Sequence, residues 1–252
     1  MAKTILVTGG TGKLGSLVVG LLRADGHDVR VASRGTGPGL FTVDWKTGAG
    51  LDAAVAGVDA IVHCAAAFND IAPDRALVAA AAKAQVPHLL YISIVGVDKI
   101  PFRYYATKRA AEELIERSGV PYTVLRTTQF HDLIRVLLAF LARSPLMFVP
   151  SLRFQPIDVS EVATRLAGLA AGSPAGHVEV MGGPQVRELT EMARVYLAAT
   201  GRRRAIVPFR LPGKAFGRFR AGDHLAPDHA VGKITLEEHL ASTKDTRKVA
   251  YR

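Results

Sequence analysis

The sequence predicts an α/β fold, a doubly wound parallel sheet followed by a small α+β lobe at the C-terminal end. Two observations support this prediction. Short apolar runs of the β type alternate with amphipathic helical runs through the first half of the 252 residues. Gly26, Gly57 and Gly119 follow three of the helical runs, where a left-handed residue commonly ends a helix, and Pro87 and Pro121 lead into strands.

The first half contains the segments expected to form the sheet and its helices. The expected strands are short and rich in β-branched or aromatic residues: Thr4–Thr8, Val29–Ser33, Leu40–Asp44, Ala60–Cys64, His88–Ser93 and Tyr122–Arg126. The expected helices have apolar residues three and four positions apart: Leu14–Ala24, Leu51–Ala56, Pro73–Gln85, Tyr104–Ser118 and Asp132–Ala142. Only Arg34–Gly39, with three glycines, separates the second strand from the third, so this connection is expected to be a bare loop.

From Ser144 onward the alternation loosens, and prolines become frequent. Here we expect helices at Asp158–Ala171 and Glu188–Ala199, a strand at His177–Met181, and short helical stretches around Lys214–Arg220 and Thr235–Ser242. Residues 1–143 are therefore expected to form the sheet domain. Residues 144–252 are expected to form a small lobe packed on its carboxyl edge, where open α/β sheets bind ligands.

Composition places the chain among globular proteins. Its 49% hydrophobic residues exclude a disordered chain, and its 24 glycines follow no collagen-like repeat. A single cysteine excludes an intramolecular disulfide and a cysteine-based metal site, and the eight histidines lack metal-ligand spacing, so no metal is expected. The sequence has no signal peptide and no run near the ~20 apolar residues of a membrane span. We therefore expect a cytoplasmic protein without a membrane partner.

The formal net charge of +10 is concentrated near the C-terminal end. Residues 202–252 hold 12 basic and 5 acidic residues, whereas the first 201 residues hold 20 and 17. Within this region, residues 202–220 carry seven cations and no acid, interleaved with phenylalanines. Such a stretch could meet a polyanion, but it contains no DNA-reading motif, and its prolines and glycines break any long helix. A lid or a solvated surface is the favoured interpretation, and nucleic acid is not expected as a partner.

A glycine-rich loop joins the first expected strand to the first expected helix. It reads Thr-Gly-Gly-Thr-Gly-Lys-Leu-Gly over residues 8–15. A strand, a tight turn and a helix N-terminus in this order bind a pyrophosphate, because the helix dipole and its free N–H groups face the anion. The sequence therefore predicts a dinucleotide site. Its expected contacts in the loop are Gly9, Gly10, Thr11, Gly12, Lys13, Leu14 and Gly15.

The end of the second strand favours NADP over NAD. A carboxylate at this place would bond the ribose 2′-hydroxyl of NAD, but the chain has Ser33 and Arg34 there. A guanidinium pairs instead with a 2′-phosphate, and Lys13 adds a second cation. A solvated loop residue is the alternative interpretation of Arg34.

The ends of the third and fourth strands supply further candidate contacts. Asp44 is placed to accept a hydrogen bond from the adenine amino group, with a solvated strand end as the alternative. Cys64, Ala65 and Ala66 are small residues that suit a backbone lying close to the adenosine. Sheet packing explains Cys64 equally well.

After the fifth strand, which ends at Ser93, the sequence Tyr104-Tyr-Ala-Thr-Lys108 begins a helix. Residues four apart share one helix face. A lysine beside a phenol lowers the pKa of the phenol and makes it a usable proton donor, and the same lysine can bond the nicotinamide ribose. Tyr-x-x-x-Lys alone is common by chance, so its weight comes from the glycine loop and Ser93 in the same chain.

These segments resemble the short-chain dehydrogenase/reductase superfamily, and more closely its atypical NmrA-like branch, which includes quinone, isoflavone-type and triphenylmethane-dye reductases. Besides the two motifs, Val-Pro-Tyr-Thr-Val-Leu-Arg-Thr-Thr-Gln-Phe and Gln-Pro-Ile-Asp-Val-Ser-Glu-Val-Ala carry the likeness, which spans residues 4–166. The resemblance implies a Rossmann-type domain, NADP(H), and reduction of a small-molecule substrate. It implies Tyr104 as proton donor, Lys108 as its activator and Ser93 as the substrate-orienting hydroxyl.

The resemblance also implies that Thr127, Thr128, Gln129 and Phe130 line the nicotinamide end. His131 follows them and could touch substrate, although a capping or packing role is favoured. Ser93 and Tyr104 are 11 residues apart, a shorter spacing than usual, so Tyr105 stays an alternative to Tyr104. Some NmrA-like members sense the redox state of the dinucleotide without turnover, usually with the tyrosine lost, and the tyrosine kept here favours an enzyme. A homodimer through the helix at 104–118 is left open.

Overall fold

The computed structural model describes residues 1–45, 47–65 and 70–243. The chain forms two compact units. Unit 1 comprises residues 1–93, 103–126 and 160–179, and unit 2 comprises residues 94–102, 127–159 and 180–252. The chain therefore passes between the units five times, and each unit is assembled from three separate segments. The boundary expected between residues 143 and 144 stays a prediction.

Unit 1 is built on a seven-stranded sheet with the order β3-β2-β1-β4-β5-β6-β9. Its strands are β1 (Thr4–Thr8), β2 (Asp28–Ser33), β3 (Leu40–Thr42), β4 (Ala60–His63), β5 (Leu89–Ile94), β6 (Tyr122–Thr127) and β9 (Gly176–His177). Both neighbours of β1 run parallel to it. In this register Ile5 pairs with Val29 on β2 and with Ala60 on β4. The strand order reverses between β1 and β4, the place where such sheets bind ligands. The predicted fold class is confirmed.

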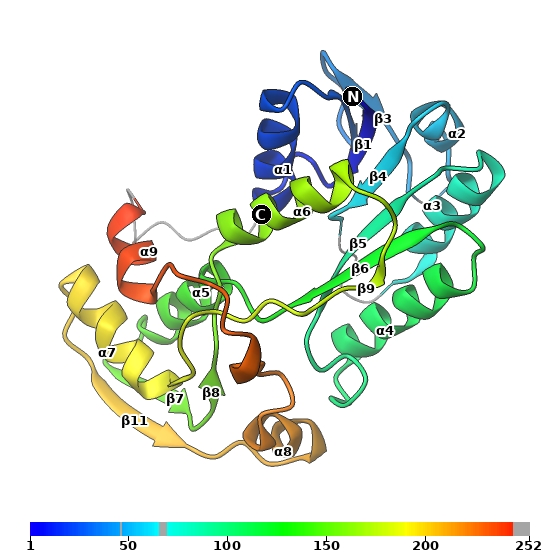
Figure 1. Cartoon of the computed structure of the whole chain (residues 1–252). Coiled ribbons are helices and arrows are strands. Elements are labelled where there is room, and N and C mark those ends of the chain that lie inside the picture. Colours follow the sequence, from blue (N-terminus) through cyan, green and yellow to red (C-terminus); the bar gives the residue numbers. More distant parts are fainter. Residues whose placement is uncertain (46, 66–69, 244–252) are drawn as a thin grey trace. The chain divides into compact units, whose positions relative to one another are not determined.

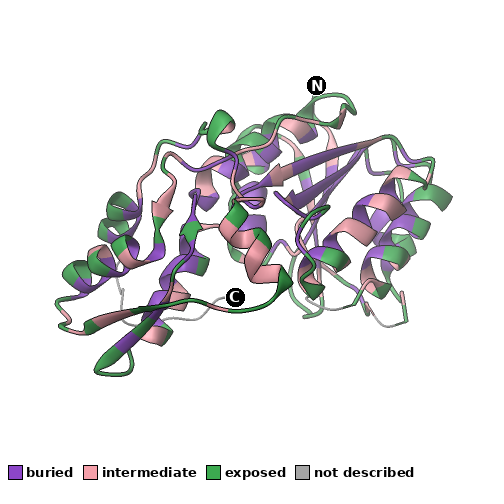
Figure 2. Cartoon of the chain, turned by 90° about the horizontal axis from the view of Figure 1, so that it is seen from below, coloured by how far each residue is buried: buried purple, intermediate pink, exposed green. Residues whose placement is uncertain are grey.

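Helices cover both faces of this sheet. They are α1 (Lys13–Ala24), α2 (Leu51–Val55), α3 (Ala72–Lys83), α4 (Arg103–Glu116) and α6 (Val159–Ala171). Figure 1 shows α1 and α6 on one face and α2, α3 and α4 on the other. The second face carries a core in which Leu6 and Ile61 of the sheet pack with Leu77 of α3 and Ile115 of α4. The central strands β1, β4 and β5 are buried on both sides, as Figure 2 shows, which explains why they read as nearly continuous apolar runs.

Two expected strands of unit 1 are shorter than predicted. β3 ends at Thr42 because the chain then turns back, with the Asp44 amide donating to the Ala49 carbonyl and the Gly48 amide to that of Asp44. The strand expected at His177–Met181 is reduced to Gly176–His177, and Met181 forms an isolated bridge with Thr127. As expected, no helix lies between β2 and β3, whose residues the structure describes in full.

Unit 2 contains α5 (His131–Leu141), α7 (Leu189–Thr200), α8 (Lys214–Ala221), a 3-10 turn (Pro227–His229) and α9 (Leu236–Ser242). It also contains two small sheets, one joining β7 (Leu146–Pro150) in parallel to β11 (Ala205–Phe209) and one joining β8 (Arg153–Phe154) to β10 (Arg187–Glu188). The sequence did not predict β7 or β11, because prolines argue against strands. Among the described strands β11 pairs only with β7, and a strand at the edge of a sheet tolerates a residue such as Pro208 that has no backbone N–H.

The core of unit 2 lies between β7, α5 and α7. Met147 and Val149 of β7 are completely buried there, together with Leu138 of α5 and Tyr196 of α7. None of the described helices is long and apolar enough to cross a membrane.

Candidate active site

The glycine loop of unit 1 begins where β1 ends and leads directly into α1. Gly12 is the N-cap residue of α1, and its amide donates to the Gly9 carbonyl at 2.9 Å, which closes the turn. Gly9 has a φ of +66°, a left-handed conformation that favours glycine. The first turn of α1 contains no acidic residue. The positive end of the helix dipole is therefore not countered where an anion would bind.

Close backbone packing explains the glycines of this loop. A Cβ atom on Gly9 would lie 2.8 Å from the Ala65 nitrogen, and one on Gly10 would lie 2.8 Å from Val31 Cγ1. A Cβ atom on Gly15 would collide with the carbonyl group of Gly9. Each glycine is thus required by a different neighbour, and together they keep α1 close to the strand ends. Thr11 and Lys13 are exposed and Leu14 is buried.

The predicted ribose and adenine contacts lie in the loops after β2 and β3. Ser33 Oγ accepts a hydrogen bond from the Gly35 amide at 3.1 Å, and Arg34 is exposed. The Asp44 carboxylate is also exposed and accepts from Thr47 Oγ1 at 2.9 Å.

After β4, the Cys64 amide donates to the Thr8 carbonyl at 3.2 Å, so this strand end is fixed to β1. Burial raises the pKa of the Cys64 thiol to about 12, against the opposing charge of Lys108. The Cys64 thiol is therefore neutral at physiological pH. Ala65 lies against Gly9, whereas Ala66 lies outside the described residues.

A buried hydrogen-bond chain that the sequence did not reveal holds the ends of β1 and β4 together. His63 Nε2 lies 3.0 Å from Asp74 Oδ1 of α3, and His63 Nδ1 lies 2.6 Å from Thr8 Oγ1. A carboxylate only accepts, so a neutral ring donates from Nε2 to Asp74 and accepts at Nδ1 from the Thr8 hydroxyl. The Thr8 oxygen accepts in turn from the Ala65 amide at 3.4 Å. The chain thus runs from α3 to the start of the glycine loop.

Lys108 lies in the interior of unit 1 beneath α4. Its ammonium group donates to the Ile92 carbonyl at 2.9 Å and lies 4.5 Å from the centre of the Tyr91 ring. Burial lowers the pKa of Lys108 to about 8, although the charges of Asp74, Cys64 and Glu112 raise it. Tyr91 is itself buried, and burial and the charge of Asp74 raise the pKa of its phenol.

Tyr104 and Tyr105 occupy different environments at the start of α4. Tyr104 is half-buried, whereas Tyr105 is 3% exposed and belongs to the core. Their rings meet edge to face with centres 6.2 Å apart. Tyr104 shares a helix face with Lys108, because they are four residues apart, and its phenol is near enough to Tyr91 to influence that group's pKa. Ser93, at the carboxyl end of β5, is buried.

Glu112 is a second residue that the sequence did not single out. It lies one helical turn after Lys108 and is completely buried. Its carboxylate accepts from Arg126 at 2.6 and 2.9 Å and from Arg109 at 3.0 Å. Burial raises the pKa of Glu112, but the hydrogen bonds from Arg126 and Arg109 lower it by more. The net pKa is therefore below the usual range. The spacing of four from Lys108 was the one sequence signal for this residue.

Residues 127–131, predicted for the nicotinamide end and the substrate, lie together in unit 2 before and at the first turn of α5. The Thr128 amide donates to the Met181 carbonyl at 2.9 Å, and Thr128 Oγ1 accepts from the Gly183 amide at 3.2 Å. Gln129 and His131 exchange backbone hydrogen bonds with Ile157 on either side of Phe130. The Thr127 carbonyl accepts from the Val95 amide at 2.9 Å. These backbone contacts fix the segment.

The His131 side chain is buried, and its Nε2 lies 2.9 Å from the Ile234 carbonyl oxygen. Its ring stacks on that of His239, with centres 5.1 Å apart. Burial lowers the pKa of His131. These contacts place the ring in the packing of unit 2, and a contact with substrate stays a prediction.

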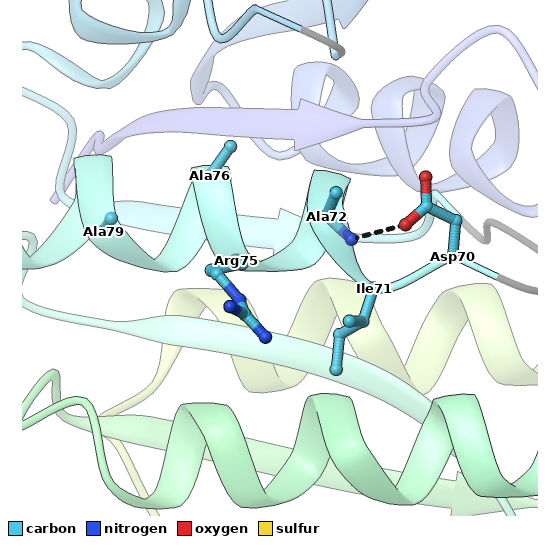
Figure 3. A pocket seen from close by; sticks show the side chains of 6 residues that line it. All are labelled: Asp70, Ile71, Ala72, Arg75, Ala76 and Ala79. Carbon is cyan, nitrogen blue, oxygen red and sulfur yellow. Dashed lines mark hydrogen bonds between the residues drawn. The ribbon is translucent and has the colours of Figure 1, made fainter.

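A shallow surface hollow of about 450 Å³ lies on α3 and the residues just before it. Figure 3 shows the side chains that line it. Ala72, Arg75, Ala76 and Ala79 lie along α3, and Ile71 and Asp70 precede the helix, where the Asp70 carboxylate accepts a hydrogen bond from the Ala72 amide at 2.9 Å. The hollow contains none of the predicted site residues. Among the described residues, no group of three or more His, Cys, Asp or Glu side chains is arranged to hold a metal ion.

A family model described as NAD(P)H-binding matches residues 9–135, half of the chain. The chain belongs to the NAD(P)H-binding family. The matched segment contains the glycine loop, Arg34, Ser93, Tyr104 and Lys108. The predicted resemblance to an atypical short-chain dehydrogenase/reductase is thereby confirmed at the level of family and fold.

Relatives of this NAD(P)H-binding protein include a curated reductase. The chain is 36% identical over 138 residues to the (4-alkanoyl-5-oxo-2,5-dihydrofuran-3-yl)methyl phosphate reductase of Streptomyces griseus. The match covers 50% of this chain and 48% of the relative, so the chain spans about half the length of the curated relative it matches.

Solved structures share the fold at low identity. The Bordetella bronchiseptica enzyme WbmH, in complex with NAD+, has a TM-score of 0.74 and 19% identity, covering 100% of this chain and 98% of that one. The NADPH-dependent quinone oxidoreductase QOR2 of Escherichia coli, complexed with NADPH, has a TM-score of 0.74 and 18% identity, covering 94% and 98%.

The loop of this family member fits a dinucleotide on its own geometry. The close approach at Gly9, Gly10 and Gly15 leaves backbone rather than side chains at the end of α1. Two exposed cations lie in the adjoining segments, with Lys13 at the start of α1 and Arg34 directly after β2. A pyrophosphate is the ligand that the N-terminus of α1 would hold.

Proposed function

We propose that this member of the NAD(P)H-binding family is an NADPH-dependent oxidoreductase that reduces a small carbonyl, quinone or activated double-bond substrate. The observation that carries the proposal is the buried Lys108, which shares a face of α4 with the half-buried Tyr104. The curated relative named as a reductase supports an oxidoreductase. The structural neighbour QOR2, which is described as NADPH-dependent, supports the choice of cofactor class.

The bound dinucleotide supplies the hydride, and the residues of this chain supply the proton and the positions. The ammonium group of Lys108 is held by the Ile92 carbonyl and by the ring of Tyr91. A positive charge at this point favours loss of the Tyr104 proton, which goes to the oxygen or carbon of the reduced substrate. Hydride and proton together complete a two-electron reduction. Ser93 is proposed to orient the substrate, and Thr127, Thr128, Gln129 and Phe130 to line the nicotinamide end.

The proton donor is tested by parallel variants at the two neighbouring tyrosines. NADPH oxidation is followed at 340 nm across a panel of quinones, aldehydes, ketones and enones, and NADPH binding is followed by fluorescence. Tyr104→Phe should lose turnover and retain NADPH binding. Tyr105→Phe is the matched control. Retained turnover in Tyr104→Phe would assign the proton to another group, and loss only in Tyr105→Phe would assign it to the buried neighbour.

Cofactor preference is tested at Arg34. The exposed guanidinium after β2 is proposed to pair with the 2′-phosphate, so Arg34→Ala should reduce the preference for NADPH over NADH by about 10- to 100-fold. Arg75→Ala, which removes an exposed arginine from α3, is the control. Equal effects of both variants on the ratio would show that general positive charge, rather than a specific contact, sets the preference.

A further inference from the structure

The outer face of the two-stranded sheet formed by β7 and β11 is more apolar than the solvent-facing side of a sheet normally is. Alternate residues of β7, Met147 and Val149, are completely buried against the core of unit 2. The residues between them must point outward, because successive side chains of a strand alternate. Leu146 is 49% exposed and Phe148 is 51% exposed. A solvated strand normally carries polar residues at such positions.

The partner strand extends the same apolar face. The parallel register pairs Phe148 with Val207 and Pro150 with Phe209, and paired residues lie on the same side of a sheet. Phe209 is 37% exposed. We define the β7–β11 face as Leu146, Phe148, Val207 and Phe209. Figure 1 shows β7 and β11 side by side, with α7 against them, so the face lies on the side away from this helix.

Exposed cations flank both ends of this face. Arg143 precedes β7 and Arg203 precedes β11, while Arg210 and Lys214 follow β11. Residues 140–157 and 201–222 contain no aspartate or glutamate.

Several acidic residues described elsewhere in unit 2 are already compensated. Asp223 pairs with Arg218 at 2.7 Å, and Glu237 pairs with Arg187 at 2.7 Å. The charge around the β7–β11 face is therefore positive.

We propose that the β7–β11 face docks on an anionic lipid surface, with its hydrocarbon side chains inserted among the lipid headgroups and its cations beside the phosphates. Apolar side chains bordered by lysine and arginine are the pattern by which peripheral proteins bind such surfaces. The expectation of no membrane partner rested on the lack of a spanning segment, and surface docking needs none.

The chemistry of the face favours lipid over a protein partner. Its four side chains are hydrocarbons, and Pro208 removes a backbone donor from β11, so the face offers few groups for the roughly one hydrogen bond per 100–200 Å² found in protein interfaces. A second copy of this chain would bring the same cations together and be repelled. Nucleic acid would need aromatic stacking platforms with polar neighbours, whereas Leu146 and Val207 are aliphatic.

Sedimentation of the full chain with vesicles tests the proposal without any measurement of turnover. We expect binding to vesicles of phosphatidylcholine with phosphatidylglycerol, weaker binding as salt rises, and little binding to phosphatidylcholine alone. Phe148→Ser should weaken binding about tenfold, which corresponds to the transfer of one aromatic side chain. Arg210→Gln should weaken it about fivefold, as expected for one cation near an anionic surface.

Two matched variants serve as controls. Phe102→Ser removes an aromatic residue of similar exposure, 49%, outside the face, and Arg75→Gln removes an exposed arginine of unit 1. Circular dichroism verifies that all four variants are folded. The proposal is overturned by no binding to the anionic vesicles, or by equal losses in the face and control variants. It is also overturned if a single-stranded oligonucleotide is bound more tightly than the vesicles, or if Phe148→Ser abolishes a concentration-dependent dimer.

Discussion

Glu112 and Arg126 form a two-point ion pair inside unit 1, with oxygen-to-nitrogen distances of 2.6 and 2.9 Å and no exposed surface on the glutamate side chain. Removing one partner of a buried pair leaves an uncompensated charge. We expect Glu112→Gln to lower the free energy of unfolding by about 3–5 kcal/mol. Urea denaturation measures this. Glu113→Gln, at a 42% exposed side chain on the same helix, should cost about 1 kcal/mol or less. Equal urea midpoints for Glu112→Gln and Glu113→Gln would contradict the structural role of the ion pair.

The lowered pKa of Lys108 should make the free energy of unfolding change with pH in the alkaline range. Its pKa falls from 10.5 to about 8 on folding, so between these values the unfolded state binds more protons than the folded state. Stability should therefore rise with pH across this window by about 3 kcal/mol at most, because burial of the charged amine is unfavourable below pH 8. The difference between wild type and Lys108→Met isolates this effect from other titrating groups. A difference that does not change from pH 7.5 to 10.5 would be inconsistent with the lowered pKa.

The same pKa sets an upper pH limit for catalysis under the proposed function. If the charged ammonium of Lys108 assists Tyr104, kcat should fall as pH rises through about 8. Lys108→Arg keeps its charge at these pH values, so any residual turnover in this variant should lose the fall near pH 8. Steady-state NADPH oxidation from pH 6 to 10 measures both profiles. An unchanged descending limb in Lys108→Arg would assign the titration to another group.

Substitutions at two glycines of α1 should distinguish an effect on cofactor binding from an effect on helix stability. Gly15→Ala places a methyl group against the Gly9 carbonyl and should weaken NADPH binding at least about tenfold, because the loop must move away from the helix start. Gly20→Ala lies on the exposed side of the same helix with no neighbour within 4 Å, and should stabilise the protein by about 1 kcal/mol without affecting binding. Fluorescence titration and thermal unfolding distinguish the two effects. Tight NADPH binding by Gly15→Ala would argue against the loop as the site.

Two buried histidines should make the protein sensitive to mild acid. Burial lowers the pKa of His88 and of His224 to about 4. The unfolded chain protonates these rings near pH 6.5 and the folded chain only near 4, so stability falls as pH decreases through this window, by roughly 3 kcal/mol for each ring. His88→Gln should reduce the loss between pH 7 and 5. Urea midpoints of the wild type and of this variant at the two pH values measure the effect, and an unchanged difference between the two midpoints would contradict it.

Local patterns were sufficient to predict the sheet of unit 1 and its glycine loop. Buried parallel strands such as Ala60–His63 are apolar at all but their last position, and α1 follows a loop whose glycines are each fixed by a neighbour. The C-terminal prolines were misleading, because the sequence does not show that Pro208 lies in a strand with a partner on one side only. That information depends on pairing with β7, whose paired residues lie 59 positions earlier in the chain.

Long-range polar contacts were the part of the candidate site that the sequence could not supply. His63 resembles any polar residue at a strand end until Thr8 and Asp74 are brought to its two nitrogens. Glu112 likewise resembles a surface residue of an amphipathic helix until Arg126 arrives from β6. A helical period identifies neighbours within one element, but it carries no information about which charge from another element meets them.

The alternation of the two units along the chain has a consequence for biosynthesis. A nascent polypeptide that ends before residue 176 lacks the last strand of the sheet, and unit 2 still lacks everything after Val159. Unit 1 therefore cannot be completed until residues 94–102 and 127–159 of unit 2 have been synthesised, in contrast to proteins whose domains emerge and fold in sequence. A nascent chain that ends near residue 180 holds all three segments of unit 1 but lacks the last and longest segment of unit 2.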